Sequence, residues 1–375
     1  MRLEELLLKV RNENAEELSL KGYGISEIPE EIFAMTKLKK LDLQDNSLKN
    51  LPEDMAKLEN LEELILDMNE FEHVPDVLRK MPNLKKLEIG KRVNEIPDWL
   101  YDLKQMDTIQ IEFYKAEYKS IPYRFSEMPN LKSLGLVDCK MESLGRNLSL
   151  FKNLEELYLH RNNISELPKD IVKLAGLKKL YLHGNGFSRI PKLISQLNSL
   201  KHLSIGNQIE SIPDWLYDNS NLETIYIFFN NIEMREFPKD FYSLNNLKNI
   251  GLMNCGIRDV PKGLSGLNEL ESFYIIDGML TSIPEELFTL NKLKTLNLTK
   301  NLITKAPYEL MRLKQLELLN LSDNPLEEIP EFLLNSENIK YLYLNNSRAY
   351  IESQDKVDEG DWQQLNDLDE IFNEL

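Results

Sequence analysis

The chain of 375 residues is poor in several features that mark particular classes of protein. It has only two cysteines, Cys139 and Cys255, which argues against a disulfide-stapled extracellular scaffold and favours a reducing compartment. No apolar run approaches the roughly 18 to 20 residues of a membrane span, so we expect no membrane insertion. The first ten residues mix Glu4, Glu5 and Lys9 with leucines, unlike a secretory signal. We therefore expect a cytoplasmic protein.

An excess of basic charge is also missing. Lys and Arg number 45 against 62 Asp and Glu, which gives a net charge of −17. Sequence-independent binding of nucleic acid needs clustered Lys and Arg to displace counterions from phosphate, and docking on anionic lipid needs the same. The composition therefore predicts no nucleic-acid partner.

Motifs that carry chemistry are absent as well. The sequence has no phosphate-binding loop, no G-x-G-x-x-G, no C-x-x-C, no H-E-x-x-H and no G-x-S-x-G elbow. Carboxylate pairs are plentiful, but they fall at positions where a solvated surface explains them. We therefore predict a protein that is not an enzyme and that holds no cofactor.

What the sequence has in abundance is leucine, 67 residues, and a regular placement of proline. Thirteen of the 16 prolines recur at steps of 22 to 25 residues, except for one step of 46 in which Gly145 stands where a proline would fall. A repeat of this length is the signature of a solenoid. These prolines are Pro29, Pro52, Pro75, Pro97, Pro122, Pro168, Pro191, Pro213, Pro238, Pro261, Pro284, Pro307 and Pro330.

The same sequence motif surrounds each proline. It reads L-x-x-L-x-L-x-x-N-x-I-x-x-I/L-P, and two clear copies begin at Leu38 and Leu154. The chain therefore resembles the leucine-rich repeat family over residues 15–347, about fifteen units. Its proline-bearing 23-residue units are most similar to intracellular Ras-scaffold-type, plant Ras-group-related and bacterial Roc-linked repeats.

The physics of the unit agrees with this resemblance. A segment such as Leu41 to Leu43 is a short strand whose alternate leucines point inward, and stacking such strands makes a parallel sheet over a continuous core. The segment after each proline is too short for a full helix, so we expect 3₁₀ turns, a thin convex side and gentle curvature. The fold class predicted is an α/β leucine-rich-repeat solenoid, a curved horseshoe with its sheet on the concave face and helical caps at both ends.

One position in each unit is expected to point a side-chain amide inward, where it satisfies the backbone of adjacent rungs. Cys139 and Cys255 occupy the same position in their own units, where a buried thiol can replace the amide. The asparagines are Asn46, Asn69, Asn162, Asn185, Asn230, Asn301 and Asn324.

A longer period lies above the short one. Leu87 to Asp102 is matched by Leu203 to Asp218 at an offset of 116 residues, and the irregular steps of 22 and 25 recur with it. A five-unit block was duplicated in tandem. The two-residue expansions near 114–118 and 230–235 are either functional loops or a feature copied with the block.

The terminal rungs need covers for their apolar faces. Residues 1–14 carry an apolar stripe at Leu3, Leu6, Leu7 and Val10 and are predicted to form an N-terminal capping helix. Residues 348–375 are predicted to be an acidic segment with a second capping helix. The alternative is that this C-terminal helix is a motif that docks in a partner's groove.

The candidate binding site lies on the outward residues of the concave strands. These residues are charged or polar in the first third and aromatic in units seven to twelve, where rungs about 4.8 Å apart predict a nearly continuous exposed strip. Tyrosines at such positions favour a protein interface, although they also suit any exposed strand. The predicted partner-binding residues are Tyr158, His160, Tyr181, His183, His202, Tyr226, Phe228, Phe229, Met253 and Tyr274. Three of them are histidines, but no cysteine joins them and we predict no metal site.

The sequence therefore predicts a monomeric, non-enzymatic scaffold that binds a protein partner on its concave face. One alternative is a bacterial effector or host-recognition protein that uses the same surface. Another is the repeat portion of a larger Roc-type GTPase. About 28 residues follow position 347, too few for a G-domain.

Overall fold

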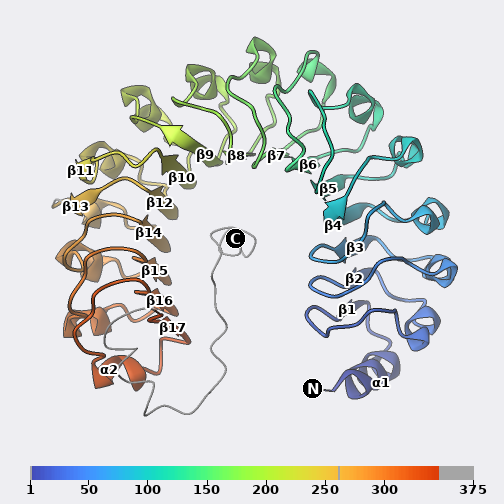
Figure 1. The fold of residues 1–375 in the computed structure, drawn as a ribbon, viewed down its shortest axis with the longest axis horizontal. Helices are drawn as coiled ribbons and strands as arrows, with labels where there is room; N and C mark the ends of the chain where they lie inside the picture. The colour runs from blue at the N-terminus through green and yellow to red at the C-terminus, as the bar shows by residue number, and fades with distance from the viewer. Residues whose placement is uncertain (1, 261, 346–375) are drawn as a thin grey trace.

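The computed structural model of the protein describes residues 2–260 and 262–345. Within them, each repeat contributes one strand to a fifteen-stranded parallel sheet, and the strands follow one another in chain order around an arch (Figure 1). The strands of this sheet are β1 (Glu17–Ser19), β2 (Lys40–Asp42), β3 (Glu63–Leu66), β4 (Lys86–Val93), β5 (Thr108–Phe113), β6 (Ser133–Val137), β7 (Glu156–Tyr158), β8 (Lys179–His183), β9 (His202–Ile209), β10 (Thr224–Phe229), β12 (Asn249–Met253), β14 (Ser272–Ile276), β15 (Thr295–Asn297), β16 (Leu318–Asn320) and β17 (Tyr341–Tyr343).

The alternation of leucines explains both the strands and the core. Leu41 of β2 and Leu64 of β3 are in register and fully buried, while Asp42 and Ile65 between the core positions are only partly buried. One rung cannot bury its apolar side alone, so each strand depends on its neighbours. The result is a single hydrophobic core that runs from Leu7 to Leu344.

The proline that ends each motif introduces a 3₁₀ turn on the convex side, as the sequence predicts. Pro52, with φ of −71°, directly precedes η2, and proline suits this position because its ring fixes φ and it needs no donor there. The 3₁₀ helices of the described residues are η1 (Glu30–Ala34), η2 (Glu53–Lys57), η3 (Asp76–Lys80), η4 (Asp98–Asp102), η5 (Tyr123–Glu127), η6 (Leu148–Leu150), η7 (Lys169–Lys173), η8 (Lys192–Gln196), η9 (Asp214–Asp218), η10 (Lys239–Ser243), η11 (Leu264–Gly266), η12 (Glu285–Thr289) and η13 (Tyr308–Arg312).

The curvature is stronger than expected. Strands β1 and β17 lie on opposite arms of the arch and face each other across its opening (Figure 1). A 3₁₀ turn takes more room than the roughly 4.8 Å that separates neighbouring strands, so each added rung bends the sheet further toward its concave side. The expectation of gentle curvature is therefore wrong.

The inward asparagines hold neighbouring rungs together. The amide nitrogen of Asn46 donates to the carbonyls of Leu20, 2.8 Å away, and Leu43, 2.9 Å away. Its Oδ1 accepts from the backbone N–H of Ile25 at 2.9 Å. Asn69, Asn162, Asn185, Asn301 and Asn324 are buried in the same way and make equivalent bonds.

Asn230 is the exception, because it is exposed rather than buried. In its rung, β10 continues to Phe229, which turns into the core and pairs with Ile209 across a register shift. The bulge moves the following residue outward. The prediction for Asn230 is therefore wrong.

A second ladder on the opposite flank was not predicted. Asn60 donates to the carbonyl of Thr36 at 2.8 Å, and Asn83 donates to that of Glu59 at 2.8 Å. Equivalent bonds are made by Asn130, Asn153, Asn221 and Asn246. Each of these asparagines directly precedes a core leucine, so the recurring Asn-Leu pair is the sequence signal.

The ends and one side element complete the fold. Helix α1 (Leu3–Glu13) buries Leu7 and Val10 in the common core, and α2 (Glu331–Leu334) takes the place of a 3₁₀ turn near the last rung. Strands β11 (Arg235–Glu236) and β13 (Ile257–Asp259) form a separate two-stranded parallel sheet. The predicted helix within residues 348–375 lies outside the described residues.

The duplicated block appears in the structure strand by strand. Strand β4 begins and ends 116 residues before β9, and β5 stands in the same relation to β10 and β6 to β12. Even the register shift recurs, since Val93 pairs with Phe113 as Ile209 pairs with Phe229. We refer to residues 40–155 as the first block and to residues 156–271 as the second block.

Candidate partner-binding surface

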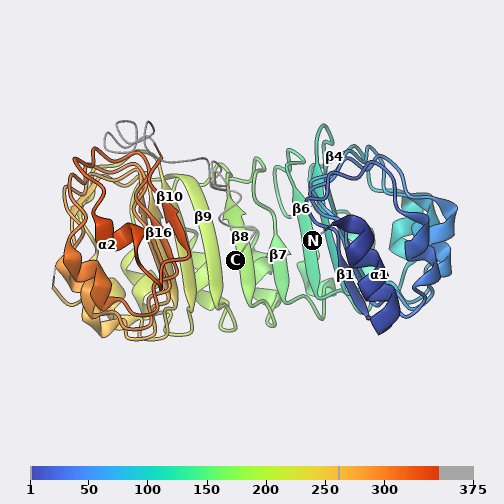
Figure 2. The ribbon, with the colours of Figure 1, turned by 90° about the horizontal axis from the view of Figure 1, so that it is seen from below.

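The inner face of the sheet carries most of the predicted site residues, and strands β6 to β9 line the middle of that face (Figure 2). Two pairs of rings stack on adjacent rungs. Tyr158 and Tyr181 are in register, with centroids 4.7 Å apart and planes 10° apart. His160 and His183 stack beside them at 4.6 Å. The structure therefore brings these four predicted residues together.

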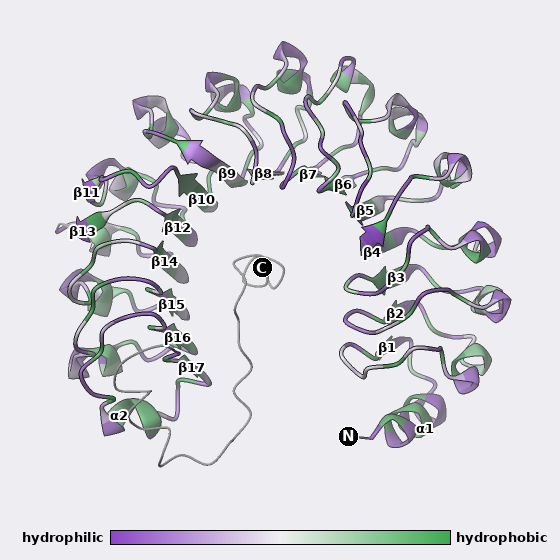
Figure 3. Cartoon of the chain, in the orientation of Figure 1, coloured by the Kyte–Doolittle hydropathy of each residue, from purple (hydrophilic) through white to green (hydrophobic). Residues whose placement is uncertain are grey.

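The expectation of a continuous exposed strip is wrong for the rungs that follow. Tyr226, Phe228, Met253, Tyr274 and Ile276 pack against one another in a second hydrophobic cluster, and none of them is more than 5% exposed. Figure 3 shows β10, β12 and β14 as strongly hydrophobic, whereas the visible end of β4 is hydrophilic. Of the predicted residues, only Tyr158, His160, Tyr181 and His202 keep partial exposure.

Two glycines allow the buried cluster to form. A Cβ on Gly251 would lie 2.6 Å from the Tyr226 ring, so its absence lets Tyr226 meet Tyr274 of the strand beyond at 5.8 Å. Gly206, with φ of +125°, is in register with His183 on one side and Phe228 on the other, and the rings of these two residues lie 5.2 Å apart. Rings on alternate strands thus touch over a rung that has no side chain, which sequence spacing alone did not indicate.

Two predicted residues are placed differently from the rest. Phe229 belongs to the main core at 1% exposure and faces away from the concave surface, so its assignment as a binding residue is wrong. His202 begins β9 in register with Lys179, at the far edge of the face from the stacked histidines. Among the described residues no group of three or more His, Cys, Asp or Glu side chains is arranged to hold a metal ion.

Burial keeps the stacked histidines neutral. It lowers the pKa of His160 to about 4 and that of His183 well below its usual value, and the charge of Arg161 acts in the same direction. Ser204 Oγ lies 2.8 Å from His183 Nδ1 and forms a hydrogen bond with it. Nδ1 of His160 is buried without a hydrogen-bond partner among the described residues. The pair therefore acts as an apolar surface at neutral pH.

The first block carries carboxylates at positions that correspond to concave residues of the second block. Burial, with the charges of Glu88 and Glu112, raises the pKa of Asp67 to about 8. Lys86 pairs with Glu88 at 2.8 Å, and Arg161 pairs with Glu112 at 2.9 Å. We call Asp42, Asp67, Glu88 and Glu112 the acidic rungs. The sequence indicated a polar front third but not this crowding.

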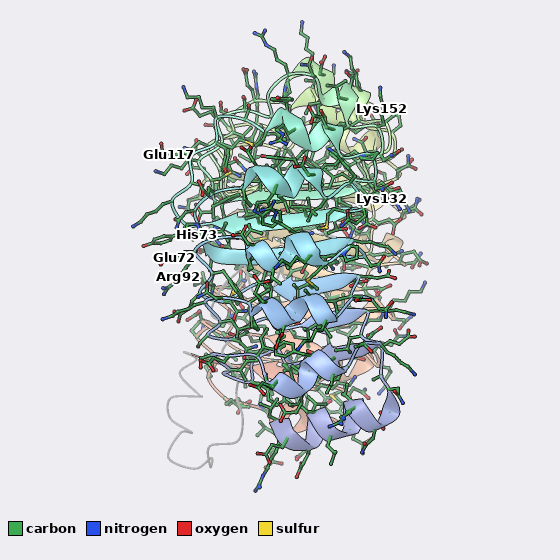
Figure 4. All side chains as sticks on the ribbon, turned by 90° about the vertical axis from the view of Figure 1, so that its right-hand side faces the viewer. Glu72, His73, Arg92, Glu117, Lys132 and Lys152 are labelled. Carbon is green, nitrogen blue, oxygen red and sulfur yellow. The ribbon has the colours of Figure 1, made fainter. Side chains whose placement is uncertain are left out.

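The flanks of the arch carry a different chemistry. Figure 4 shows Glu72, His73, Arg92 and Glu117 along one flank and Lys132 and Lys152 along the other. Exposed pairs join neighbouring rungs there, such as Lys140 with Glu117 at 2.6 Å. Exposed ion pairs contribute little individually. We therefore regard the ion pairs on the flanks as weak surface contacts and place no site there.

The two cysteines are free and fully buried. Their Sγ atoms lie 3.8 Å from the Leu136 carbonyl and 3.7 Å from the Leu252 carbonyl, in the place where an asparagine amide bonds in other rungs. Burial raises the pKa of each thiol to about 12. Neither is a reactive nucleophile. No helix in the described parts of the chain is long and apolar enough to cross a membrane.

Comparison with known families agrees with this architecture. A leucine-rich repeat region model matches residues 17–128, a leucine rich repeat model matches 129–187 and 268–326, and a BspA type leucine rich repeat region model matches 193–264. With the fold, these matches define the chain as a leucine-rich-repeat protein. They are general repeat models, and none is specific to Ras-scaffold-type or Roc-linked repeats.

One solved structure supports the same horseshoe fold. The chain is similar to a leucine-rich-repeat protein of Leptospira interrogans, with 25% identity, 95% of each chain covered and a TM-score of 0.55. It is also similar to the internalin InlF of Listeria monocytogenes, with 20% identity, 92% of this chain and 95% of that chain covered and a TM-score of 0.49. No curated protein matches the sequence.

Proposed function

We propose that the chain is a non-enzymatic scaffold that binds a protein partner on the concave face of its arch. Leucine-rich-repeat proteins are generally protein-interaction modules, and the matched models cover repeats only. The observation that carries the proposal is the pair of stacked tyrosines, Tyr158 and Tyr181, partly exposed in the middle of the sheet. Tyrosines held rigid in this way lose little entropy on binding and are favoured at interfaces.

The proposed centre of the site is Tyr158 and Tyr181. Tyr226 is 1% exposed and cannot contact a partner without a change in the sheet. His160 lies beside the tyrosines and extends the same surface. Tyr226, Phe228, Met253 and Tyr274 are packed against one another on the strands that follow, so they stabilise the sheet beside the site and do not form the site itself.

The test is affinity capture with matched variants. Immobilised wild type, Tyr181→Arg and Tyr123→Arg are incubated with cell lysate, and bound proteins are quantified by mass spectrometry. Tyr123 is 69% exposed in η5 on the convex side, so it controls for the substitution itself. We expect Tyr181→Arg to reduce specific capture at least about 10-fold, the scale of an interface hot spot, and Tyr123→Arg to leave it unchanged. The reverse pattern would contradict concave binding.

The location and assembly state are parts of the same proposal. Two buried, free thiols support a reducing compartment and hence the cytoplasm. The proposal also takes the protein to act as a monomer. An effector or host-recognition role uses the same surface and differs only in the source of the partner, which the capture experiment identifies.

A further inference from the structure

We propose that the partner presents a basic, extended segment, which docks across the acidic rungs of the first block. This inference rests on the proposed function and adds the chemistry of the partner. The acidic rungs lie on β2, β4 and β5 and directly after β3, and β6 separates β5 from β7 and β8, which carry the stacked tyrosines. The segment therefore continues from the tyrosine surface toward the N-terminal arm of the arch.

The first step of the argument is a comparison within the chain. Counted 116 residues on, the acidic rungs become Tyr158, His183, Ser204 and Phe228. The core residues between them are unchanged in kind, since Leu41, Leu64 and Leu87 correspond to Leu157, Leu180 and Leu203, all fully buried. Both blocks fold into the same strands with the same register shift. The four carboxylates are therefore not required by the fold.

The second step is the geometry over Gly90. A Cβ placed on Gly90 would lie 3.0 Å from Oδ1 of Asp67 and 3.4 Å from Oε2 of Glu112. Two carboxylates from strands on either side thus lean over the same glycine. In the second block the equivalent Gly206 is covered by the stacked rings of His183 and Phe228. The structure fills this place with packed rings in one copy and with two carboxyl groups in the other.

The third step is the balance of charge. Lys86 and Arg161 compensate Glu88 and Glu112, but no ion pair or hydrogen bond reaches the Asp67 side chain from any residue that the structure describes. Burial raises the pKa of Asp67, and the charges of Glu88 and Glu112 raise it further. An incoming ammonium or guanidinium group would supply the missing opposite charge and return the carboxyl to its ionised form. Charge complementarity thus selects a cationic partner.

The fourth step decides between cations. The described carboxylates do not form a group that could hold a metal ion, and nucleic acid would be repelled by them. Four rungs at about 4.8 Å span roughly 14 Å, which about four or five residues of extended chain also cover. Lysine or arginine at alternate positions of such a segment, about 7 Å apart, would place two or three cations over the four rungs.

The experiment measures binding of two fluorescein-labelled 12-residue peptides by fluorescence anisotropy. One peptide alternates lysine with serine and the other alternates glutamate with serine. The concave variant carries Asp67→Asn, Glu88→Gln and Glu112→Gln. The control carries Glu72→Gln, Glu95→Gln and Glu142→Gln, three exposed positions outside the concave strands, so both variants lose three carboxyl groups and the control loses at least as much net charge.

We expect the lysine peptide to bind wild type and the control with Kd values within about 2-fold of each other, and the concave variant at least about 10-fold more weakly. Asp67→Asn alone should weaken binding by about 3-fold, which keeps the test decisive if the triple variant folds poorly. The glutamate peptide should bind none of them.

Equal weakening in both triple variants would mean that bulk charge alone attracts the peptide, and unchanged binding in the concave variant would place the peptide elsewhere. Either result overturns the acidic rungs as the docking surface. Neither result affects the capture experiment, because that experiment tests the tyrosine surface through Tyr181→Arg and does not depend on the acidic rungs. Failure of the basic segment is therefore distinguishable from failure of the concave site.

Discussion

The two blocks have the same architecture and opposite concave surfaces. The first block places Asp67, Glu88 and Glu112 around Gly90, whereas the second places His183 and Phe228 over Gly206. Buried positions are tied to neighbours on both sides, so a change there costs stability in two rungs. A residue on the concave face can be replaced without this cost in stability, unless its side chain is large enough to touch a side chain two strands away. The comparison shows that the second block has converted a surface into a second core.

The largest difference between the blocks should appear when the ring of Tyr226 is removed. Tyr226→Ala deletes a side chain that is 1% exposed, and we expect it to lower the free energy of unfolding by about 3 kcal/mol or more. The equivalent change in the first block, Gln110→Ala, should cost about 0.5 kcal/mol or less because Gln110 is only partly buried. Urea denaturation of both variants measures the difference, and equal losses would refute the second core.

The blocks should also respond to pH with opposite sign. The pKa of Asp67 is about 8 in the folded chain against 3.8 for an ordinary aspartate, so the unfolded chain releases its proton first and stability falls as pH rises from about 4 to 8. The pKa of His183 is lowered from 6.5, so the unfolded chain takes up a proton first and stability falls as pH drops below about 6.5.

Melting temperatures between pH 4 and 8 test this pair. Asp67→Asn should raise Tm by about 2 °C or more at pH 8 and have little effect at pH 4. His183→Gln removes a packed ring at every pH, so its cost should be smaller at pH 5 than at pH 8. If the melting temperatures of wild type and both variants changed with pH in parallel, neither Asp67 nor His183 would have the shifted pKa on which this prediction rests.

A smaller difference is expected at the matched glycines. A Cβ on Gly251 would lie 2.6 Å from the Tyr226 ring, whereas on Gly135 it would lie 3.0 Å from Cγ of the flexible Gln110. Gly251→Ala should therefore cost about 1 kcal/mol or more in unfolding free energy, and Gly135→Ala less than half of that. A costlier Gly135→Ala would mean that the ring contact does not set the limit.

The cysteines should show no difference between blocks at all. Cys139 and Cys255 are equally buried and both have a pKa raised to about 12, so a thiol reagent at pH 8 should label neither in the folded protein. Both should react at once after denaturation. Rapid native labelling of one of them would reveal local opening in its block.

The fold could be predicted from the sequence because the same pattern of residues occurs in unit after unit. Proline spacing and alternating leucines indicated the strands, the 3₁₀ turns and the buried asparagines, and only Asn230 failed, where a register shift turns Phe229 inward. The concave surface was less predictable. An outward position on a strand does not remain exposed when Gly206 or Gly251 lets rings on alternate strands touch. That contact depends on curvature, which no single unit encodes.

The equal register of the two blocks has a consequence for how such a chain changes length. Strand β4 pairs with β5 through the same contacts, shift included, as β9 with β10. Removing residues 87–202 would join Lys86 to Leu203, and each side of the new junction would meet neighbours equivalent to those it already has. Loss or gain of one block would therefore shorten or extend the arch by five rungs while every junction stays of a kind that the fold already contains. The reach of the arch is thus a quantity that changes in whole steps of one block.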